Sequence, residues 1–265
     1  RVDRKEIERD IQQGFKEKLS PATMDLYCHL VSLFDPQSPL AEGYRSLRTV
    51  IEFSGLAQGR KVIAFVSAGA QEGKSTSAVN LAISLAQDGK RVLLVDADLR
   101  KPILHERLGL EPTPGLSEVL LGAVPYTEAI RTVTDLILGK LGVDTVINAP
   151  GLDNLNILTS GRKPENPAEF MNSPRLKELI ETVKAEYDVT IFDCPPILPV
   201  TDGVTLGSKV DGVVIVYQVG KVGRNALKRA KALLENANAT VLGIVLSNVS
   251  AELTPDYAPY GDRYK

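Results

Sequence analysis

The segment from Val62 to Thr76, VIAFVSAGAQEGKST, decides the fold of this chain. It begins with an apolar run typical of a buried strand, continues through a turn of small residues, and ends in Gly73-Lys74-Ser75-Thr76. The following residues, SAVNLAISLAQ, have the pattern of a helix. A strand, a tight loop and a helix that opens on Gly-Lys-Ser are typical of a phosphate-binding loop, because backbone N–H groups at the helix start point toward an anion. We therefore predict a phosphate site here.

Two side chains of this loop carry the expected chemistry. Lys74 would reach the outer phosphates of a nucleotide, and the hydroxyl of Ser75 would hold Mg²⁺. The nucleotide-binding residues predicted from the loop are Gln71, Glu72, Gly73, Lys74, Ser75 and Thr76.

The first half of the loop departs from the usual pattern. Ala68 stands where a glycine is expected, and Gly69 comes one position late. Ala70 and Gln71 occupy the centre, where a more flexible residue is easier to place. The alternative interpretation is a glycine-rich helix start in an ordinary α/β domain. We expect a working nucleotide site that is weaker than usual.

The composition is that of a soluble globular protein. The 265 residues are 43% hydrophobic and 24% charged, and the formal net charge of −2 argues against a nucleic-acid partner. No apolar run approaches the ~18 residues of a membrane span. The two cysteines, Cys28 and Cys194, lie in different contexts, which favours reduced thiols and a cytoplasmic protein. The chain begins at Arg1 rather than Met, so an upstream membrane segment stays an alternative.

From Lys61 onward, apolar strand patterns alternate with helix patterns. Near-continuous apolar strands are typical of parallel strands buried on both faces, so we predict an α/β fold with a mostly parallel central sheet and helices on both faces. The predicted strands are 62–67, 91–96, 154–159, 188–193, 212–218 and 240–247, and the predicted helices are 74–88, 174–186 and 223–237. Residues 107–152 are predicted to form helices and loops over one sheet edge.

The segments outside this alternation complete the predicted organisation. We divide the chain into an N-terminal helical and linker segment (1–39), a P-loop domain (40–251) and a flexible tail (252–265). Residues 4–19 predict a helix whose apolar face, Ile7, Ile11 and Phe15, contacts either a partner or the chain's own sheet. A second helix is predicted over Leu40 to Phe53.

Acidic residues follow two of the predicted strands. Asp96 and Asp98 end the strand in VLLVDADLRKP, and Asp193 ends the strand in VTIFDCPP. Because ligand sites in parallel sheets lie beyond the carboxyl ends of the strands, these acids should lie near the phosphate loop and could serve Mg²⁺ or accept a proton. Cys194 is interpreted as a packed small residue, and Asp202 as a pocket residue or a helix N-cap.

The tail holds an unusual group of aromatic residues. Tyr257, Tyr260 and Tyr264 are three of the eight tyrosines of the chain. They could anchor the tail to the domain, or they could be substrates. Prolines and a glycine around them favour an extended segment without a core role.

Taken together, these motifs resemble the bacterial tyrosine kinases of capsule and exopolysaccharide systems, which are related to the ParA and MinD type of P-loop ATPases. The resemblance covers roughly residues 40 to 265. It rests on GKST at 73–76, DADLRKP at 96–102, FDCPP at 192–196, AEGYRSLRT at 41–49, KPENPAEF at 163–170 and the tyrosine tail. The family usually has Pro and Gly where Ala70 and Gln71 stand.

The resemblance implies a P-loop NTPase fold and a role for each matching residue. Lys74 would contact the phosphates of ATP, while Ser75, Asp98 and Asp193 would serve Mg²⁺. Asp96 would be the base for the incoming phenol, although a carboxylate with an ordinary pKa near 4 is a weak base for a phenol with a pKa near 10.

The resemblance also implies partners and a location. Glu42, Arg45 and Arg48 would contact a neighbouring subunit of a ring-like homo-oligomer, in which one tail enters the next site. An internal Glu–Arg pair on a solvated helix is the alternative. Asn248 would contact the base of the nucleotide. We expect a cytoplasmic domain at the inner face of the membrane, held there by a membrane activator, a polysaccharide co-polymerase segment that is fused or separate.

Two other functions stay open at this point. The first is an ATPase switch of the MinD or ParA kind, although the loop lacks the extra lysine typical of that group. The second is a nucleotide-poor scaffold in an export complex, which Ala70 and Gln71 favour.

Overall fold

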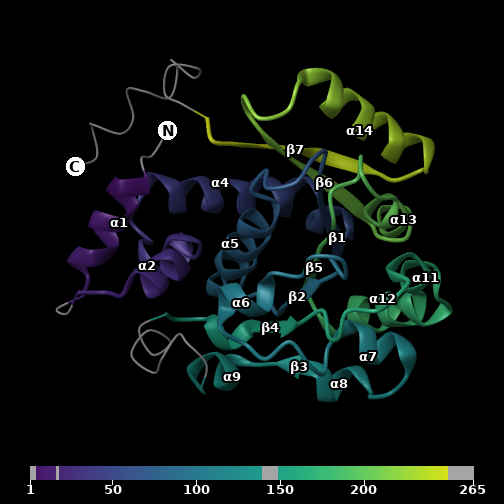
Figure 1. Ribbon diagram of the computed structural model, residues 1–265, viewed down its shortest axis with the longest axis horizontal. Coiled ribbons are helices and arrows are strands. Elements are labelled where there is room, and N and C mark those ends of the chain that lie inside the picture. Colours follow the sequence, from purple (N-terminus) through teal and green to yellow (C-terminus); the bar gives the residue numbers. More distant parts are fainter. Residues whose placement is uncertain (1–3, 16–17, 139–148, 250–265) are drawn as a thin grey trace.

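A central sheet organises the molecule (Figure 1). The computed structural model describes residues 4–15, 18–138 and 149–249, so the predictions on the tail lie outside the described residues. In the described part, the strand order is β3-β4-β2-β5-β1-β6-β7. The strands are β1 (Val62–Ser67), β2 (Val92–Asp96), β3 (Ile130–Arg131), β4 (Leu155–Leu158), β5 (Val189–Asp193), β6 (Gly212–Gln218) and β7 (Val241–Ser247).

Neighbouring strands pair in parallel, except that β3 runs antiparallel to β4. All the strands predicted from the sequence are confirmed. The apolar runs of β1, β2 and β5 are buried along their whole length, as expected for strands covered on both faces, whereas Ile244 and Leu246 of the edge strand β7 are exposed. Strand β3 was not predicted. It has two residues, which is too short for a periodic pattern.

Helices cover both faces of the sheet, as the sequence predicts. One apolar core joins the sheet to α4 (Pro39–Ser54) and α5 (Lys74–Gln87). The other joins it to α12 (Pro174–Glu186), α13 (Asp202–Gly207) and α14 (Arg224–Asn236). Figure 1 shows the two groups on opposite sides of the strands. Helix α5 is buried from Ser77 to Ala86, which fixes the helix that follows the phosphate loop.

The N-terminal segment packs against this domain through aromatic and aliphatic side chains. It forms α1 (Arg4–Gln13), α2 (Pro21–Cys28) and α3 (Val31–Phe34). Ile11 is 1% exposed, and the ring centroid of Phe15 lies 5.4 Å from that of Tyr27. The apolar face predicted on this helix therefore packs on the chain's own core. The predicted helix over 4–19 ends earlier, at Gln13, and Pro21 then begins α2.

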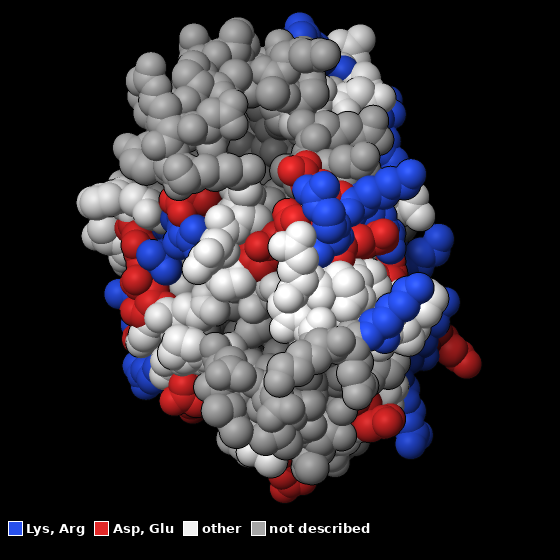
Figure 2. Space-filling view, turned by 90° about the vertical axis from the view of Figure 1, so that its left-hand side faces the viewer, with Lys and Arg blue, Asp and Glu red and all other residues white. Residues whose placement is uncertain are grey.

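The remaining helices are short. They are α6 (Leu104–Leu108), α7 (Leu116–Leu121), α8 (Tyr126–Ala129), α9 (Val133–Leu138), α11 (Pro167–Asn172) and the 3-10 turns η1 (Leu56–Gln58) and η2 (Leu152–Asn154). Within the described ranges, no helix has both the length and the apolar character needed to cross a membrane. On the face in Figure 2, Lys and Arg side chains lie among Asp and Glu side chains.

Candidate active site

The phosphate loop and the predicted acids meet at one edge of the sheet. Strand β1 leads into the loop, while Asp96 ends β2 and Asp193 ends β5. In the register of the sheet, Asp193 is paired with Asp96 on one side and with Phe65 on the other. Because parallel strands present their carboxyl ends at the same edge, three segments that are distant in sequence converge there.

Lys74 lies at the centre of this convergence. Its Nζ donates a hydrogen bond to Oδ1 of Asp193 and another, of 3.2 Å, to Oγ of Ser75. Lys74 is 7% exposed, and Asp193 is fully buried. A buried ammonium group requires such partners, because an unpaired charge in a protein interior is strongly unfavourable.

The other oxygen of Asp193 is an acceptor without a partner. Oδ2 is buried and makes no hydrogen bond. Among the described residues, no three His, Cys, Asp or Glu side chains gather closely enough to hold a metal ion by themselves. This arrangement fits Mg²⁺, which keeps several waters and binds through one or two carboxylates together with substrate phosphates. Ser75 and Asp98 are the other candidate oxygen donors.

Asp96 is held rigidly beneath the site. Its Oδ2 accepts hydrogen bonds from the backbone N–H groups of Ile103 (3.2 Å) and Leu104 (3.0 Å), and its Oδ1 accepts one from Asp98 (3.2 Å). Burial, reinforced by the carboxylate of Asp193, raises the pKa of Asp96 to about 7. The ordinary value near 4 assumed from the sequence is therefore wrong for this environment. Burial also raises the pKa of Asp98.

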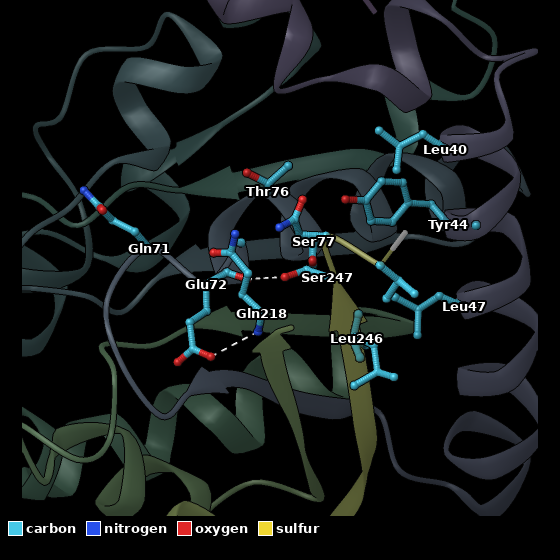
Figure 3. Close-up of a pocket in the computed structure, with 15 residues that line it drawn as sticks. Leu40, Tyr44, Leu47, Gln71, Glu72, Thr76, Ser77, Gln218, Leu246 and Ser247 are labelled. Atoms are coloured by element: carbon cyan, nitrogen blue, oxygen red, sulfur yellow. Dashed lines mark hydrogen bonds between the residues drawn. The ribbon is translucent and has the colours of Figure 1, made fainter. Parts of the chain in front are cut away.

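The first half of the loop is held by Glu72, whose side chain is 1% exposed. One carboxylate oxygen accepts the backbone N–H of Gly69, and the other accepts that of Gln218 at 3.1 Å. The hydroxyl of Ser247 donates to the backbone oxygen of Glu72 at 2.7 Å (Figure 3). Glu72 thus ties the loop to the ends of β6 and β7.

A pocket of about 520 Å³ opens beside the loop. It lies between the start of α4, the end of β7 and residues 71–77 (Figure 3). Tyr44 and Ser77 both line it. Asn248 lies on its wall and has a φ of 56°, a backbone conformation that asparagine tolerates better than most residues. Tyr44 was not predicted as a site residue, although it lies within the AEGYRSLRT motif.

A second pocket, of about 760 Å³, lies between α2 and α6. Its polar wall includes Asp25, His29 and Arg107. The guanidinium of Arg107 donates a hydrogen bond to Oγ1 of Thr76, so this pocket borders the phosphate loop as well. Arg107 could not be predicted from the sequence, because no local pattern connects α6 to Thr76, 31 residues earlier.

The predicted subunit-contact residues make contacts within the chain. Arg45 pairs with Glu42 at 2.6 Å and donates to the backbone oxygen of Pro36 at 2.7 Å. Arg48 donates to the backbone oxygen of Ser84 at 3.0 Å and lies 3.3 Å from the carboxylate of Asp88. The internal Glu–Arg pair considered from the sequence is therefore present, and Arg48 fastens α4 to α5.

Two further residues lie close to the predicted site. Asp202 accepts hydrogen bonds from Arg100 at 2.6 and 3.1 Å, and it is the first residue of α13, after the N-cap Thr201. Asp202 is therefore not the N-cap of α13, and its carboxylate is held as the ion-pair partner of Arg100, while its place in the pocket stays a prediction. Cys194 is fully buried, and burial raises the pKa of its thiol, which supports the interpretation as a packed residue.

The chain is similar in sequence to proteins named tyrosine-protein kinases. A family model described as an AAA domain matches residues 60–242, more than half of the chain. The tyrosine-protein kinase YwqD of Bacillus subtilis (strain 168) is 38% identical over 235 residues, which cover 89% of this chain and 92% of that protein.

Solved structures give the same picture of the fold. The kinase domain of the Escherichia coli tyrosine kinase ETK matches with a TM-score of 0.75 and 26% identity, over 90% of this chain and 84% of that structure. The septum site-determining protein MinD of Pyrococcus horikoshii OT3, solved with Mg-ADP, matches with a TM-score of 0.54 and 24% identity, over 70% of this chain and 69% of that structure. The predicted P-loop NTPase fold is confirmed.

Proposed function

Because the chain belongs to the family of bacterial protein-tyrosine kinases, we propose that it transfers the γ-phosphoryl group of ATP to the tyrosines of its own tail, Tyr257, Tyr260 and Tyr264. The observation that carries this proposal is the convergence of Lys74 and the acids of β2 and β5 beside a pocket of nucleotide size. Such phosphorylation would regulate polysaccharide synthesis or export.

The nucleotide would lie along the phosphate loop. The base and ribose would occupy the pocket between α4 and β7, beside Tyr44 and Asn248. The phosphates would lie at the start of α5, where the backbone N–H groups of Gly73 to Thr76 and the helix dipole favour an anion. Lys74 would then exchange part of its contact with Asp193 for the phosphates.

The residues that would hold Mg²⁺ are Ser75, Asp98 and Asp193. Support comes from the buried, unpartnered Oδ2 of Asp193, which is an oxygen ligand of the kind that Mg²⁺ prefers. When bound, the ion would neutralise negative charge on the phosphates during transfer.

Asp96 would accept the phenolic proton. Transfer from a phenol with a pKa near 10 to a base with a pKa near 4 is uphill by about 8 kcal/mol, whereas a base with a pKa near 7 reduces this to about 4 kcal/mol. Burial of Asp96 therefore makes it a better base than its type suggests. A loose transition state for phosphoryl transfer lets the proton leave late, so positioning matters most.

The acceptor tyrosine would approach through the pocket between α2 and α6. Ile103 and Arg107 line that pocket, and they contact Asp96 and Thr76 respectively. Asp96 has no exposed atom, so the phenol would have to displace the segment around Ile103 to contact it. The nucleotide and the acceptor would thus enter from different sides of the loop.

We also propose a homo-oligomer in which the tail of one subunit enters the site of the next. The exposed pair Glu42 and Arg45 would contact the neighbour, while Arg48 keeps α4 fixed on α5. A membrane activator, fused or separate, would place the domain at the inner face of the cell membrane.

The test is incubation with radiolabelled ATP and Mg²⁺, followed by mapping of the phosphate by mass spectrometry. Label is expected on Tyr257, Tyr260 or Tyr264 and should disappear in Lys74→Met. Hydrolysis of ATP without label on the protein would favour the MinD-like switch. Absence of ATP binding would favour the scaffold.

Mixing two variants tests transfer between subunits. One variant carries Lys74→Met and keeps its tail. The other keeps Lys74 and has phenylalanine at the three tail positions. Label on the tail of the Lys74→Met chain would support transfer in trans, and absence of label in the mixture would overturn it.

A further inference from the structure

Gln71 has a backbone conformation that glutamine rarely adopts. Its φ is 59°, in the left-handed region where a side chain is strained. Among the described residues, the other non-glycine residues with positive φ are Asn238 and Asn248, and asparagine tolerates this region. Gln71 therefore occupies a place suited to glycine and needs an external contact to stay there.

That contact comes from Lys221, in the segment between β6 and α14. Its Nζ donates a hydrogen bond of 2.7 Å to the backbone oxygen of Gln71 and lies 3.5 Å from the side-chain oxygen Oε1. The two residues are 150 positions apart in sequence. Figure 3 shows the Gln71 side chain pointing away from the other labelled residues of the pocket.

Lys221 is one of several contacts that this segment makes with the loop. The backbone N–H of Gln218 donates to the carboxylate of Glu72. A Cβ at Gly69 would lie 3.3 Å from Cγ1 of Val222. Residues 218–222 therefore brace the first half of the loop at Gly69, Gln71 and Glu72.

The hydrogen bond to Lys221 also fixes the direction of the next N–H group. The carbonyl of Gln71 and the N–H of Glu72 belong to one trans peptide plane and point in opposite directions. Because Lys221 holds the carbonyl, the N–H of Glu72 points away from Lys221. In phosphate-binding loops the backbone N–H groups face the phosphates.

We propose that Lys221 is a positioning residue for ATP binding, which holds Gln71 in the left-handed conformation that the loop requires. The inference rests on the proposed function, since it assumes that ATP binds to this loop. It assigns a role to the β6–α14 segment and explains how the loop tolerates glutamine in place of glycine.

The test is a double-mutant cycle on ATP binding, measured by calorimetry with Mg²⁺. Lys221→Met is expected to raise the Kd for ATP roughly five-fold, because it removes a hydrogen bond from a charged donor. In the Gln71→Gly background the same change should alter the Kd less than about two-fold, since glycine adopts positive φ without support. In tail phosphorylation, Lys221→Met should raise KM for ATP and leave kcat within about two-fold.

The matched control is Lys228→Met, which removes an exposed lysine of α14 and should leave the Kd unchanged. An equal loss of affinity on Lys221→Met in both backgrounds would overturn the inference, because Lys221 would then act on the nucleotide directly. An unchanged Kd for Lys221→Met with glutamine at 71 would also overturn it. If the wild-type chain bound no ATP, the proposed function would fail and this inference with it.

Discussion

The two halves of the phosphate loop are built differently. The second half, Gly73 to Thr76, follows the expected sequence pattern and faces the acids that end β2 and β5. The first half, Gly69 to Glu72, departs from the pattern and faces the ends of β6 and β7. The second half owes its chemistry to its own residues. The first half owes its shape to Lys221, Gln218 and Ser247, which lie far away in sequence.

This difference shows how a loop can lose its usual residues and keep its conformation. Gly73, with a φ of 92°, needs no support, while Gln71 receives it from Lys221. A positive φ in this loop can therefore come from a glycine, as at position 73, or from a contact with a distant residue, as at position 71.

The largest effect on activity is expected from removing the positive charge of Lys74, in the second half of the loop. Lys74→Met should reduce tail phosphorylation by about 10²-fold or more, because a preorganised cation at the phosphates stabilises the transition state. Initial rates with radiolabelled ATP give the measurement. Lys228→Met is the matched control and should keep the wild-type rate; a rate for Lys74→Met within ten-fold of it would contradict the assignment.

The next largest effect is on the pH dependence of stability, and it comes from Asp96, one of the acids that face the second half of the loop. The pKa of Asp96 rises from 3.8 to about 7 on folding, so the folded state keeps a proton that the unfolded state loses. Stability should therefore fall as the pH rises from 5 to 7, by up to about 2.5 kcal/mol. The Asp96→Asn variant has no carboxyl group at this position, so it lacks this contribution to the pH dependence of stability.

The measurement is the melting temperature without nucleotide at pH 5 and pH 7. The difference between Asp96→Asn and wild type should shift in favour of the variant by about 5 °C as the pH rises. Asp98, whose pKa is also raised, leaves the variant with part of the pH dependence. A constant difference between the two proteins would contradict the raised pKa of Asp96.

A smaller effect should follow from loosening the first half. Glu72→Ala leaves the N–H groups of Gly69 and Gln218 without their acceptor, which should lower the free energy of unfolding by about 2 kcal/mol. Urea denaturation gives the value. Glu235→Ala, which removes an exposed i,i+4 pair with Lys231, should cost no more than about 0.5 kcal/mol. Equal losses in the two variants would show that Glu72 does not brace the loop.

The smallest effects are expected from substitutions at the two loop residues with positive φ, Gln71 and Gly73. Gly73→Ala places a side chain at a φ of 92° and should lower the free energy of unfolding by about 1.5 kcal/mol. Gln71→Gly relieves strain but frees the unfolded chain, so its effect should stay within about 0.5 kcal/mol. Urea denaturation of both variants checks the pair. A large loss in Gln71→Gly would mean that the glutamine side chain itself supports the loop.

Much of the site could be predicted because its residues stand at the ends of strongly patterned elements. Asp96 and Asp193 each follow an apolar strand, and parallel strands bring their ends together. Arg107 and Lys221 could not be predicted, because each reaches the loop through a contact between distant segments. The nucleotide contact predicted for Glu72 stays a prediction for its backbone N–H, and the sequence did not show that its carboxylate binds the backbone N–H groups of Gly69 and Gln218.

The sequence by itself determined the six parallel strands, the helix after the loop and the chemistry of Lys74, since apolar periodicity and glycine placement act through nearest neighbours. Only the tertiary structure decided the state of those groups. Burial against Asp193 moves the pKa of Asp96 to about 7. A lysine from the β6–α14 segment holds Gln71 in place. Both effects depend on desolvation and on distances across the fold, which no local pattern contains.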